Sequence, residues 1–291
     1  MREKITPSVT TVSSWRGFLG WVHDLPRPDK RDRPKWIYRG HDQSHYRLAT
    51  SLEREARDLR ISVRSLGKLE GRVSREFRRH LHHYTEHVPH ALDIVELFAI
   101  MQHFGAPTRL QDWTYSPFVA SYFAIEEAHA KSCSVWAIDA APLMADDLAG
   151  LLGHEQIESD FAAAHAEHMV PLDIDPSKAL QSKVASFLFR HPRRCVSCVN
   201  PYRLNERLTV QQGVFLMPGD LTLTLESNLA SMSLPHGSIR RVDVELGRDT
   251  RKEFLLNLYR MNISRATLFP GLEGYAESLR TRLAIPETLS R

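Results

Sequence analysis

Apolar residues recur at the 3.6-residue spacing of a helix in several stretches of the chain. The stretch 91–105 is strongly apolar, and Gly105 is a suitable helix stop because glycine readily adopts a left-handed cap conformation. The stretch 52–87 has one apolar face on an otherwise polar segment, which predicts one long helix or two. Helices are predicted at 12–24, 52–87, 91–105, 116–130, 251–262 and 272–283, and residues 142–190 are expected to be mainly helical or loop.

Other stretches carry the pattern of strands. Residues 133–139, "CSVWAID", alternate in polarity and contain β-branched and aromatic residues, which favour a pleated surface. Strands are predicted at 35–40, 108–114, 133–139, 207–217, 221–226 and 239–246. Because strands and helices interleave irregularly, without a βαβ rhythm, the pattern indicates an α+β fold and not a doubly wound sheet.

Composition places the chain among globular proteins. Hydrophobic residues make up 42% of its 291 residues and charged residues 25%, which is enough to bury a core. No apolar run reaches the roughly 18 residues of a membrane-spanning helix, and the N-terminus lacks the apolar region of a secretory signal. Three cysteines are too few for a disulfide framework. We therefore expect a cytoplasmic protein with no membrane partner.

Arginine is concentrated in three runs, although the net charge is only +3. These runs lie at 27–35, 70–83 and 189–195. The planar fork of arginine suits phosphate groups, so the runs point to an anionic partner such as nucleic acid. A solvated helix face is the alternative for each run taken alone.

Motifs of common catalytic sites are absent from the sequence. It contains no P-loop, no G-x-G-x-x-G after a strand, no H-E-x-x-H and no G-x-S-x-G. Cys195 and Cys198 form a lone C-x-x-C, whereas a zinc site needs two more ligands. His83 and His87 have i, i+4 spacing but no ligand pattern beside them. We expect no metal cofactor.

Polar residues at strand ends are the remaining candidates for chemistry. The strand at 35–40 ends in Arg39, and Gly40 beside it allows a close approach to the backbone. Gln211 and Gln212 interrupt a later apolar strand. Between them, one strand-to-helix transition gathers Gln102, His103, Thr108, Arg109, Asp112, Trp113, Thr114 and Ser116, followed by the aromatic rings of Tyr122 and Phe123. Structural roles are the alternative, such as a pairing of Arg39 with Asp112.

Five segments together resemble the FRG domain family. They are "WIYRGHDQSHYRLATSLER" (36–54), "QHFGAPTRLQDWTYSPFVASYFA" (102–124), "VWAID" (135–139), "NERLTVQQGVF" (205–215) and "LFPGLEGYA" (268–276). The family is named for a Phe/Tyr-Arg-Gly triplet, which is Tyr38-Arg39-Gly40 here. The resemblance spans roughly residues 15–279 and implies a single FRG domain over 1–291, with a core at about 30–220 and a C-terminal extension at 221–291.

The order of these segments is similar to that of ADP-ribosyltransferases of the R-S-E type. This resemblance implies a split β-sheet core with N-terminal, inserted and C-terminal helices. It also implies an arginine that holds NAD, matched here by Arg39, and a hydroxyl-bearing strand end, matched by Thr114 and Ser116. The third element usually carries a glutamate, where this chain has Gln211 and Gln212. Asp112 or Glu206 are the candidates to supply the missing charge.

The resemblance implies that NAD is bound as a substrate. The expected catalytic residues are Arg39, Thr114 and Gln212, and the expected NAD-binding residues are Tyr38, Arg39, Gly40, Arg109, Asp112, Trp113, Thr114, Ser116, Tyr122 and Gln211. The expected activity is a toxin-like or phage-defence ADP-ribosyltransferase that modifies RNA or DNA and is restrained by an inhibitory antitoxin protein. The alternatives are an NAD glycohydrolase, a protein ADP-ribosyltransferase, and a non-catalytic nucleic-acid or protein-binding module.

Overall fold

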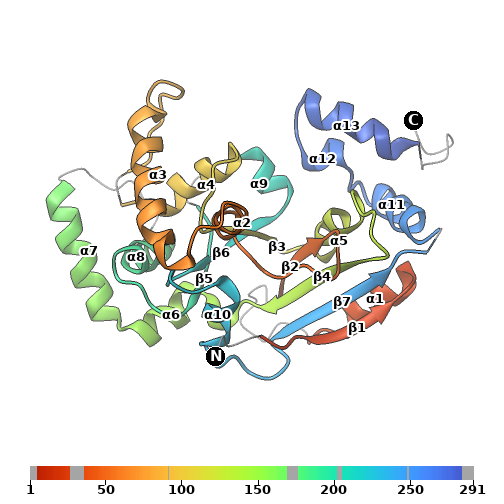
Figure 1. The fold of residues 1–291 in the computed structure, drawn as a ribbon, viewed down its shortest axis with the longest axis horizontal. Coiled ribbons are helices and arrows are strands. Elements are labelled where there is room, and N and C mark those ends of the chain that lie inside the picture. The colour runs from red at the N-terminus through yellow and green to blue at the C-terminus, as the bar shows by residue number, and fades with distance from the viewer. Residues whose placement is uncertain are drawn as a thin grey trace.

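Seven strands form one mixed sheet in the computed structural model, which describes residues 5–26, 36–90, 92–168, 176–201, 205–247 and 249–283. Their order across the sheet is β1-β7-β4-β2-β3-β6-β5 (Figure 1). The strands are β1 (Ser8–Val12), β2 (Trp36–His41), β3 (Gln111–Thr114), β4 (Ser132–Asp139), β5 (Val196–Val199), β6 (Gly213–Pro218) and β7 (Ile239–Glu245). The α+β class expected from the sequence is confirmed.

Thirteen α-helices pack around this sheet within the described residues. They are α1 (Trp15–His23), α2 (Ser51–Asp58), α3 (Leu66–Leu81), α4 (Ile94–His103), α5 (Pro117–Ile125), α6 (Ala145–Leu152), α7 (His154–His168), α8 (Pro176–Arg190), α9 (Glu206–Val210), α10 (Leu225–Ala230), α11 (Thr250–Arg260), α12 (Arg265–Leu268) and α13 (Leu272–Arg282). Short 3-10 turns occupy Val63–Ser65 and Ala141–Leu143. None of the helices in these described ranges is long and apolar enough to cross a membrane.

Different helices cover the two ends of the sheet (Figure 1). Helices α1, α5 and α11 pack on the β2-β4-β7 end, where Trp15, Phe18 and Phe254 stack in one aromatic cluster. Helices α3, α4, α6 and α8 pack around a second cluster that includes Phe98 and Phe187 at the β5-β6 end. Burial of these side chains supplies most of the driving force for folding.

The two ends of the sheet meet at a single residue pair. Strand β2 pairs antiparallel with β4 over its whole length, but it pairs with β3 only where Tyr38 lies opposite Thr114. Strand β3 continues instead along β6, from Gln111 to Thr114. The backbones of β2 and β3 therefore diverge next to Arg39, and a space opens between them.

Several predicted elements are confirmed with adjusted bounds. The first helix begins at Trp15 and is capped by Ser14, whose hydroxyl accepts a hydrogen bond from the backbone of Gly17. The segment 52–87 forms two helices, α2 and α3, and the helix predicted at 116–130 ends at Ile125. Strands β1 and β5 are absent from the sequence prediction. Both are short, with five residues in β1 and four in β5, which leaves little room for an alternation to show.

One predicted strand is wrong, and another is correct only in its second half. Residues 206–210 form helix α9, because Asn205 caps its start by accepting from the backbone of Leu208. The strand predicted at 207–217 begins only at Gly213, after Gln212 turns the chain with a φ of +49°. Residues 221–224 lead into helix α10, which Thr224 caps, so no strand exists at 221–226. Local capping hydrogen bonds outweigh the β propensity of these threonines and leucines.

The segment expected as a C-terminal extension supplies an inner strand of the sheet. Strand β7 lies between β4, with which it pairs antiparallel, and β1, with which it pairs parallel. Residues 239–245 therefore belong to the core, together with residues 8–12 from the other end of the chain.

Gly40 is required where β2 crosses helix α5. A Cβ atom at this position would lie 2.1 Å from the carbonyl oxygen of Ala120 and 2.6 Å from the backbone nitrogen of Ala124. Both neighbours are backbone atoms and cannot rotate away. Because side chains alternate across a strand, Arg39 projects to the other face of β2 from this contact.

We expect Gly40→Ala to lower the free energy of unfolding by about 1–3 kcal/mol or more, because the added methyl group overpacks this contact. Urea denaturation followed by circular dichroism measures the change. Gly67→Ala is the matched control, since a Cβ at Gly67 meets nothing within 4 Å. In the exposed helix α3 it should raise stability by up to about 1 kcal/mol. Equal effects of the two substitutions would contradict the steric explanation.

Candidate functional site

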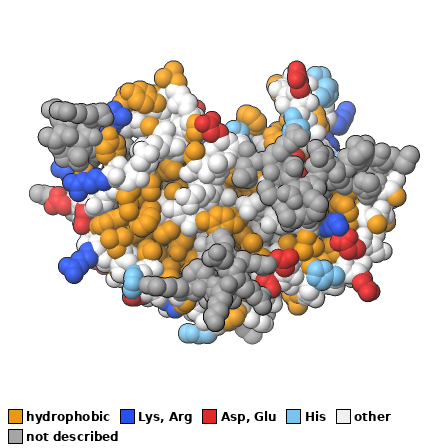
Figure 2. All heavy atoms as spheres, turned by 180° about the vertical axis from the view of Figure 1, so that it is seen from behind, with side chains coloured by type: hydrophobic (Ala, Val, Ile, Leu, Met, Phe, Trp, Pro, Cys, Tyr) orange, Lys and Arg blue, Asp and Glu red, His pale blue; other side chains and the backbone are white. Residues whose placement is uncertain are grey.

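A cleft lies where β2 and β3 diverge, and it consists of two adjoining cavities of about 290 and 1130 Å³. Six residues line both: Arg39, Gly40, His103, Phe123, Asn205 and Arg207. The surface is visibly notched between the projecting end that carries α3 and the one that carries α12 and α13 (Figure 2). Small-molecule sites are typically about 300–1,000 Å³, so the cleft is large enough for a dinucleotide.

Arg39 is held in place at the centre of this cleft. Its Nη1 donates a hydrogen bond to the backbone carbonyl of Asp112, and its Nε donates to Nε2 of His41 at 3.1 Å. Burial lowers the pKa of Arg39 to about 10, so the guanidinium remains charged at neutral pH. The remaining N–H groups of this half-buried side chain are available to a ligand.

His41 serves Arg39 as a neutral acceptor. Its side chain is buried, and burial together with the charge of Arg39 lowers the pKa of the imidazole to about 3. An imidazolium could not accept a hydrogen bond at Nε2, so the low pKa maintains the contact with Arg39. His41 also lines the larger cavity. The sequence offered no sign of this role beyond its place two residues after Arg39.

Most of the residues predicted for the site lie in the smaller cavity. Its lining includes Tyr38, Arg39, Gly40, Asp112, Trp113, Thr114 and Gln211. The hydroxyl of Thr114 donates to the backbone carbonyl of Gln211 at 2.7 Å and accepts from the backbone of Ser116. Arg39 and Thr114 therefore converge as expected, although the Thr114 hydroxyl is already engaged in joining β3 to the turn after α9.

Four predicted residues line neither cavity. Gln212 forms the left-handed turn before β6, and its carbonyl accepts from the backbone of Tyr115. Ser116 caps α5, and Tyr122 is buried and donates to Glu126 at 2.7 Å. The guanidinium of Arg109 is buried against Glu70, with Nε 2.9 Å from both carboxylate oxygens. The side chains of Arg109, Ser116 and Tyr122 and the backbone of Gln212 are therefore used in the fold.

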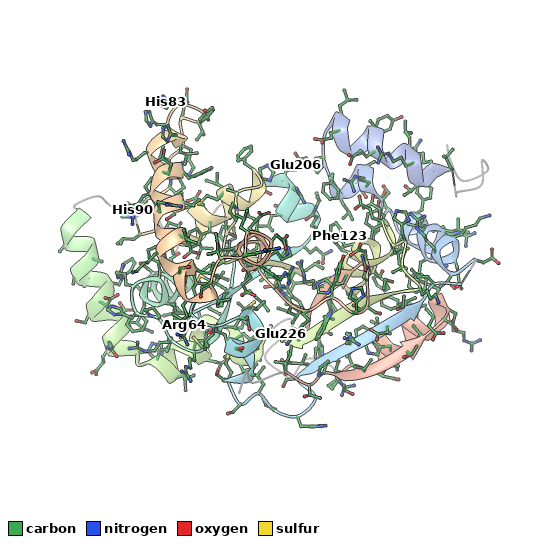
Figure 3. All side chains as sticks on the ribbon, viewed as in Figure 1. Arg64, His83, His90, Phe123, Glu206 and Glu226 are labelled. Carbon is green, nitrogen blue, oxygen red and sulfur yellow. The ribbon has the colours of Figure 1, made fainter. Side chains whose placement is uncertain are left out.

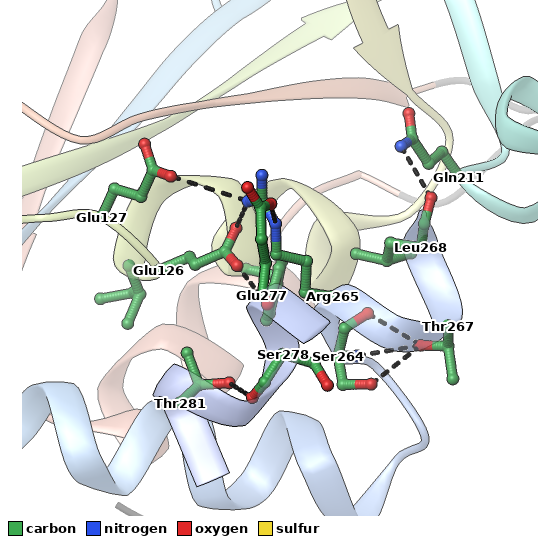
Figure 4. A network of polar contacts seen from close by, with 12 residues as sticks. Glu126, Glu127, Gln211, Ser264, Arg265, Thr267, Leu268, Glu277, Ser278 and Thr281 are labelled. Carbon is green, nitrogen blue, oxygen red and sulfur yellow. Dashed lines mark hydrogen bonds and ion pairs between the residues drawn. The ribbon is translucent and has the colours of Figure 1, made fainter. Parts of the chain in front are cut away.

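Carboxylates from distant segments also line the larger cavity, and several of them meet around Arg265 (Figure 4). Arg265 of α12 contacts Glu126 and Glu127 at the end of α5 and Glu277 of α13. The ring of Phe269 lies between the guanidinium groups of Arg207 (4.4 Å) and Arg265 (4.6 Å). Sequence reasoning missed these carboxylates, because the partners of Arg265 are brought together only by the fold.

The two candidates for the missing negative charge both line the cleft. Asp112 lines the smaller cavity, is exposed, and interacts electrostatically with Arg39 and Arg207. Glu206, in the first turn of α9, lines the larger cavity opposite Phe123 of α5 (Figure 3). Either carboxylate is placed to act on a ligand held by Arg39.

The cysteines of the C-x-x-C motif and His87 lie in environments that suit a structural role. Cys195 and Cys198 are buried, and burial raises the pKa of these thiols to about 11 and 12. His87 contacts Glu96 at 2.8 Å. Within the described ranges no group of three or more potential ligands is placed to hold a metal ion. Of the arginine runs, 27–35 lies outside the described residues, 70–83 lies mostly in α3, and Arg190 of the third pairs with Asp160.

Comparison with known proteins supports one family assignment. Residues 34–133 match the family model of the FRG domain, so the chain contains an FRG domain in this region. The match includes Tyr38-Arg39-Gly40 and confirms the resemblance seen in the sequence, while the segments after residue 133 lie beyond it. No curated protein and no solved structure matches the chain.

We expect Arg109→Ala to lower the free energy of unfolding by about 3–5 kcal/mol, because it leaves Glu70 buried without its partner. Thermal or urea denaturation measures the loss. Replacing both residues, with Arg109→Met and Glu70→Leu, should restore much of the stability. If Arg109→Ala instead weakens ligand binding without changing stability, the structural role assigned to Arg109 is wrong.

His41 should make stability fall as pH drops from about 6.5 toward 3. In this window the unfolded imidazole binds a proton, whereas the native imidazole, with a pKa of about 3, does not. Each proton bound only by the unfolded state favours unfolding. His41→Gln, which retains an acceptor for Arg39, should reduce this pH dependence by a few kcal/mol. Urea denaturation of both proteins from pH 7 to 4 checks the expectation, and parallel curves would contradict it.

Proposed function

We propose that the protein is an NAD-dependent ADP-ribosyltransferase whose active site is the cleft around Arg39. The observation that carries the proposal is the position of Arg39, which is charged, fixed by two hydrogen bonds and shared by both cavities. Arginine binds a pyrophosphate through paired, charge-assisted hydrogen bonds. The combined volume of the cavities accommodates NAD together with an acceptor group.

In the proposed reaction, the bond between the ribose C1′ and the nicotinamide nitrogen breaks. The electron pair leaves with neutral nicotinamide, and positive charge develops on the sugar, as in glycoside cleavage. A nucleophilic atom of the acceptor then bonds to C1′ and releases its proton to solvent. Arg39 orients the phosphates, and a carboxylate near the sugar stabilises its charge. We assign this carboxylate to Glu206 or Asp112.

The proposed acceptor is a nucleic acid, RNA or DNA, and the proposed biological role is that of a toxin-like or phage-defence enzyme under the control of an inhibitory protein. Support for the acceptor comes from the arginine-rich helix α3 and from Arg54 and Arg57 of α2, which line the cleft. With water as acceptor, the same site would be an NAD glycohydrolase.

A non-catalytic binding module is the second candidate. It is favoured by one observation, that the Thr114 hydroxyl is occupied by protein hydrogen bonds while Gln211 donates to the carbonyl of Leu268.

We expect purified protein to release nicotinamide from NAD and to transfer labelled ADP-ribose to one class of macromolecule. Arg39→Ala should reduce the rate about 100-fold or more, because it removes substrate orientation and charge. Arg260→Ala is a matched control, since it removes an exposed arginine of α11 and should leave the rate unchanged. Nicotinamide release is measured by chromatography, and label transfer is measured with RNA, DNA and protein supplied separately.

The two carboxylate candidates are separated by Glu206→Gln and Asp112→Asn. Loss of turnover with retained NAD binding identifies the residue that stabilises the charged sugar. Nicotinamide release that needs no acceptor would assign the protein as a glycohydrolase. No release and no NAD binding by a folded protein would overturn the proposal in favour of a binding module.

A further inference from the structure

Helix α3 presents a row of cations to solvent. Its exposed positions include five basic side chains, and these are Arg64 in the turn before it, Lys68, Arg72, Arg75 and Arg79. At 3.6 residues per turn, the directions of the four residues within α3 fall inside an arc of about 60°. With a rise of 1.5 Å per residue, these four span about 16 Å along the helix. We call these five residues the α3 basic row.

The α3 basic row is not balanced by neighbouring carboxylates. Within the described part of the chain, Arg79 is the member of the row with a recorded ion pair, to Glu76 at 3.9 Å. The other acidic residue of α3, Glu70, is fully buried on the opposite side of the helix, where it neutralises Arg109. Five cations therefore face one exposed carboxylate, and the row generates a positive potential along a line.

The surroundings of the row favour a nucleic acid over a lipid surface. The apolar residues of α3, among them Leu66 and Leu81, are buried against the core, so the helix has no apolar face to insert into a membrane. Four of the five cations are arginines, which bind phosphates through paired donors. A linear row of phosphate-binding groups matches a linear polyanion.

The larger cavity of the cleft is also lined by arginines. Arg54 and Arg57 of α2, the helix that precedes the row, line the larger cavity together with Arg39 and Arg47. Exposed aromatic rings lie beside them: Tyr46 in the lining, and Phe104 directly after the lining residue His103. Unpaired bases stack on such rings, which duplex bases cannot do.

The carboxylates of the cleft favour ribose over deoxyribose. Glu127 and Glu273 line the same cavity as the arginines, and both are exposed, although Glu127 also pairs with Arg265 at 3.6 Å. Carboxylates repel phosphates but accept hydrogen bonds from hydroxyl groups. A strand with its phosphates on the arginines would therefore gain from 2′-hydroxyl groups directed to the carboxylates, and these hydroxyl groups are present only in RNA.

We propose that single-stranded RNA binds along the α3 basic row and enters the cleft that the α2 arginines and these carboxylates line. The statement that this RNA is the acceptor of ADP-ribose rests on the function proposed above. The binding of RNA does not depend on that function, and it is measured without NAD.

The test is binding of a short fluorescently labelled single-stranded RNA to the full chain, followed by anisotropy at increasing salt. The five phosphate contacts of the row alone predict a slope of log K against log salt of about −3.5, and contacts in the cleft make the slope steeper. The variant Lys68→Ala/Arg72→Ala/Arg75→Ala should bind on the order of 100-fold more weakly at about 0.1 M salt, with a slope shallower by about 2. Its nicotinamide release should remain unchanged, because none of the three lines the cleft.

A second triple variant controls for net charge. Lys252→Ala/Arg260→Ala/Arg280→Ala removes three exposed cations from α11 and α13, at the other end of the molecule (Figure 1), and should bind RNA like the parent protein. Equal losses in the two variants would overturn the proposal, since binding would then depend on net charge alone.

Binding of other anionic ligands tests whether the site prefers single-stranded RNA. Single-stranded DNA of the same sequence and the corresponding RNA duplex should bind more weakly than single-stranded RNA. Equal binding of either, or equal binding of an acidic peptide or of vesicles with anionic lipids, would overturn the assignment. Arg39→Ala should still bind RNA through the row. Absence of turnover in a protein that still binds RNA would overturn only the proposed transferase activity. Absence of RNA binding in a protein that still releases nicotinamide would overturn only the proposed RNA site.

Discussion

The close approach of β2 to helix α5 at Gly40 determines the geometry of the whole cleft. With no side chain between them, the strand and the helix backbone come into contact, and Arg39 projects to the other face of the strand. The next strand, β3, pairs with β2 only at Tyr38 and then follows β6. The divergence creates the cavity, and Arg39 is the first side chain exposed by it.

Electrostatics inside the cleft follow from this geometry. Segments β2 and α2 contribute arginines to the lining of the larger cavity, whereas the end of α5 and helix α13 contribute glutamates. Arg265 joins two of these glutamates, Glu126 and Glu277. A ligand that carries both phosphates and hydroxyl groups fits such a lining, because the arginines suit the phosphates and the glutamates suit the hydroxyl groups.

Prediction from the sequence succeeded where local pattern and final environment agree. The strands at 36–41, 132–139 and 239–245 were found because each is a short run rich in apolar, β-branched or aromatic residues, and β4 is buried on both faces. The strand predicted at 207–217 was correct only from Gly213 onward, because a side-chain cap at Asn205 and a left-handed turn at Gln212 outweigh strand propensity before it. Arg109 was taken for a ligand-binding residue because nothing near it in sequence reveals Glu70, 39 residues earlier, as its buried partner.

The sequence by itself determined the class of fold and the FRG triplet and singled out Arg39 as a candidate, since all three are written in short contiguous patterns. The tertiary structure alone decided which polar residues meet in the cleft. Thr114 and Gln211 line the smaller cavity together with Arg39, whereas Gln212 and Arg109 line neither cavity and serve the fold. The sequence analysis did not predict His41, Glu126 and Arg265, which also line the cleft. The physical reason is that a polar side chain serves the fold or a ligand according to its partners, and those partners come from distant segments.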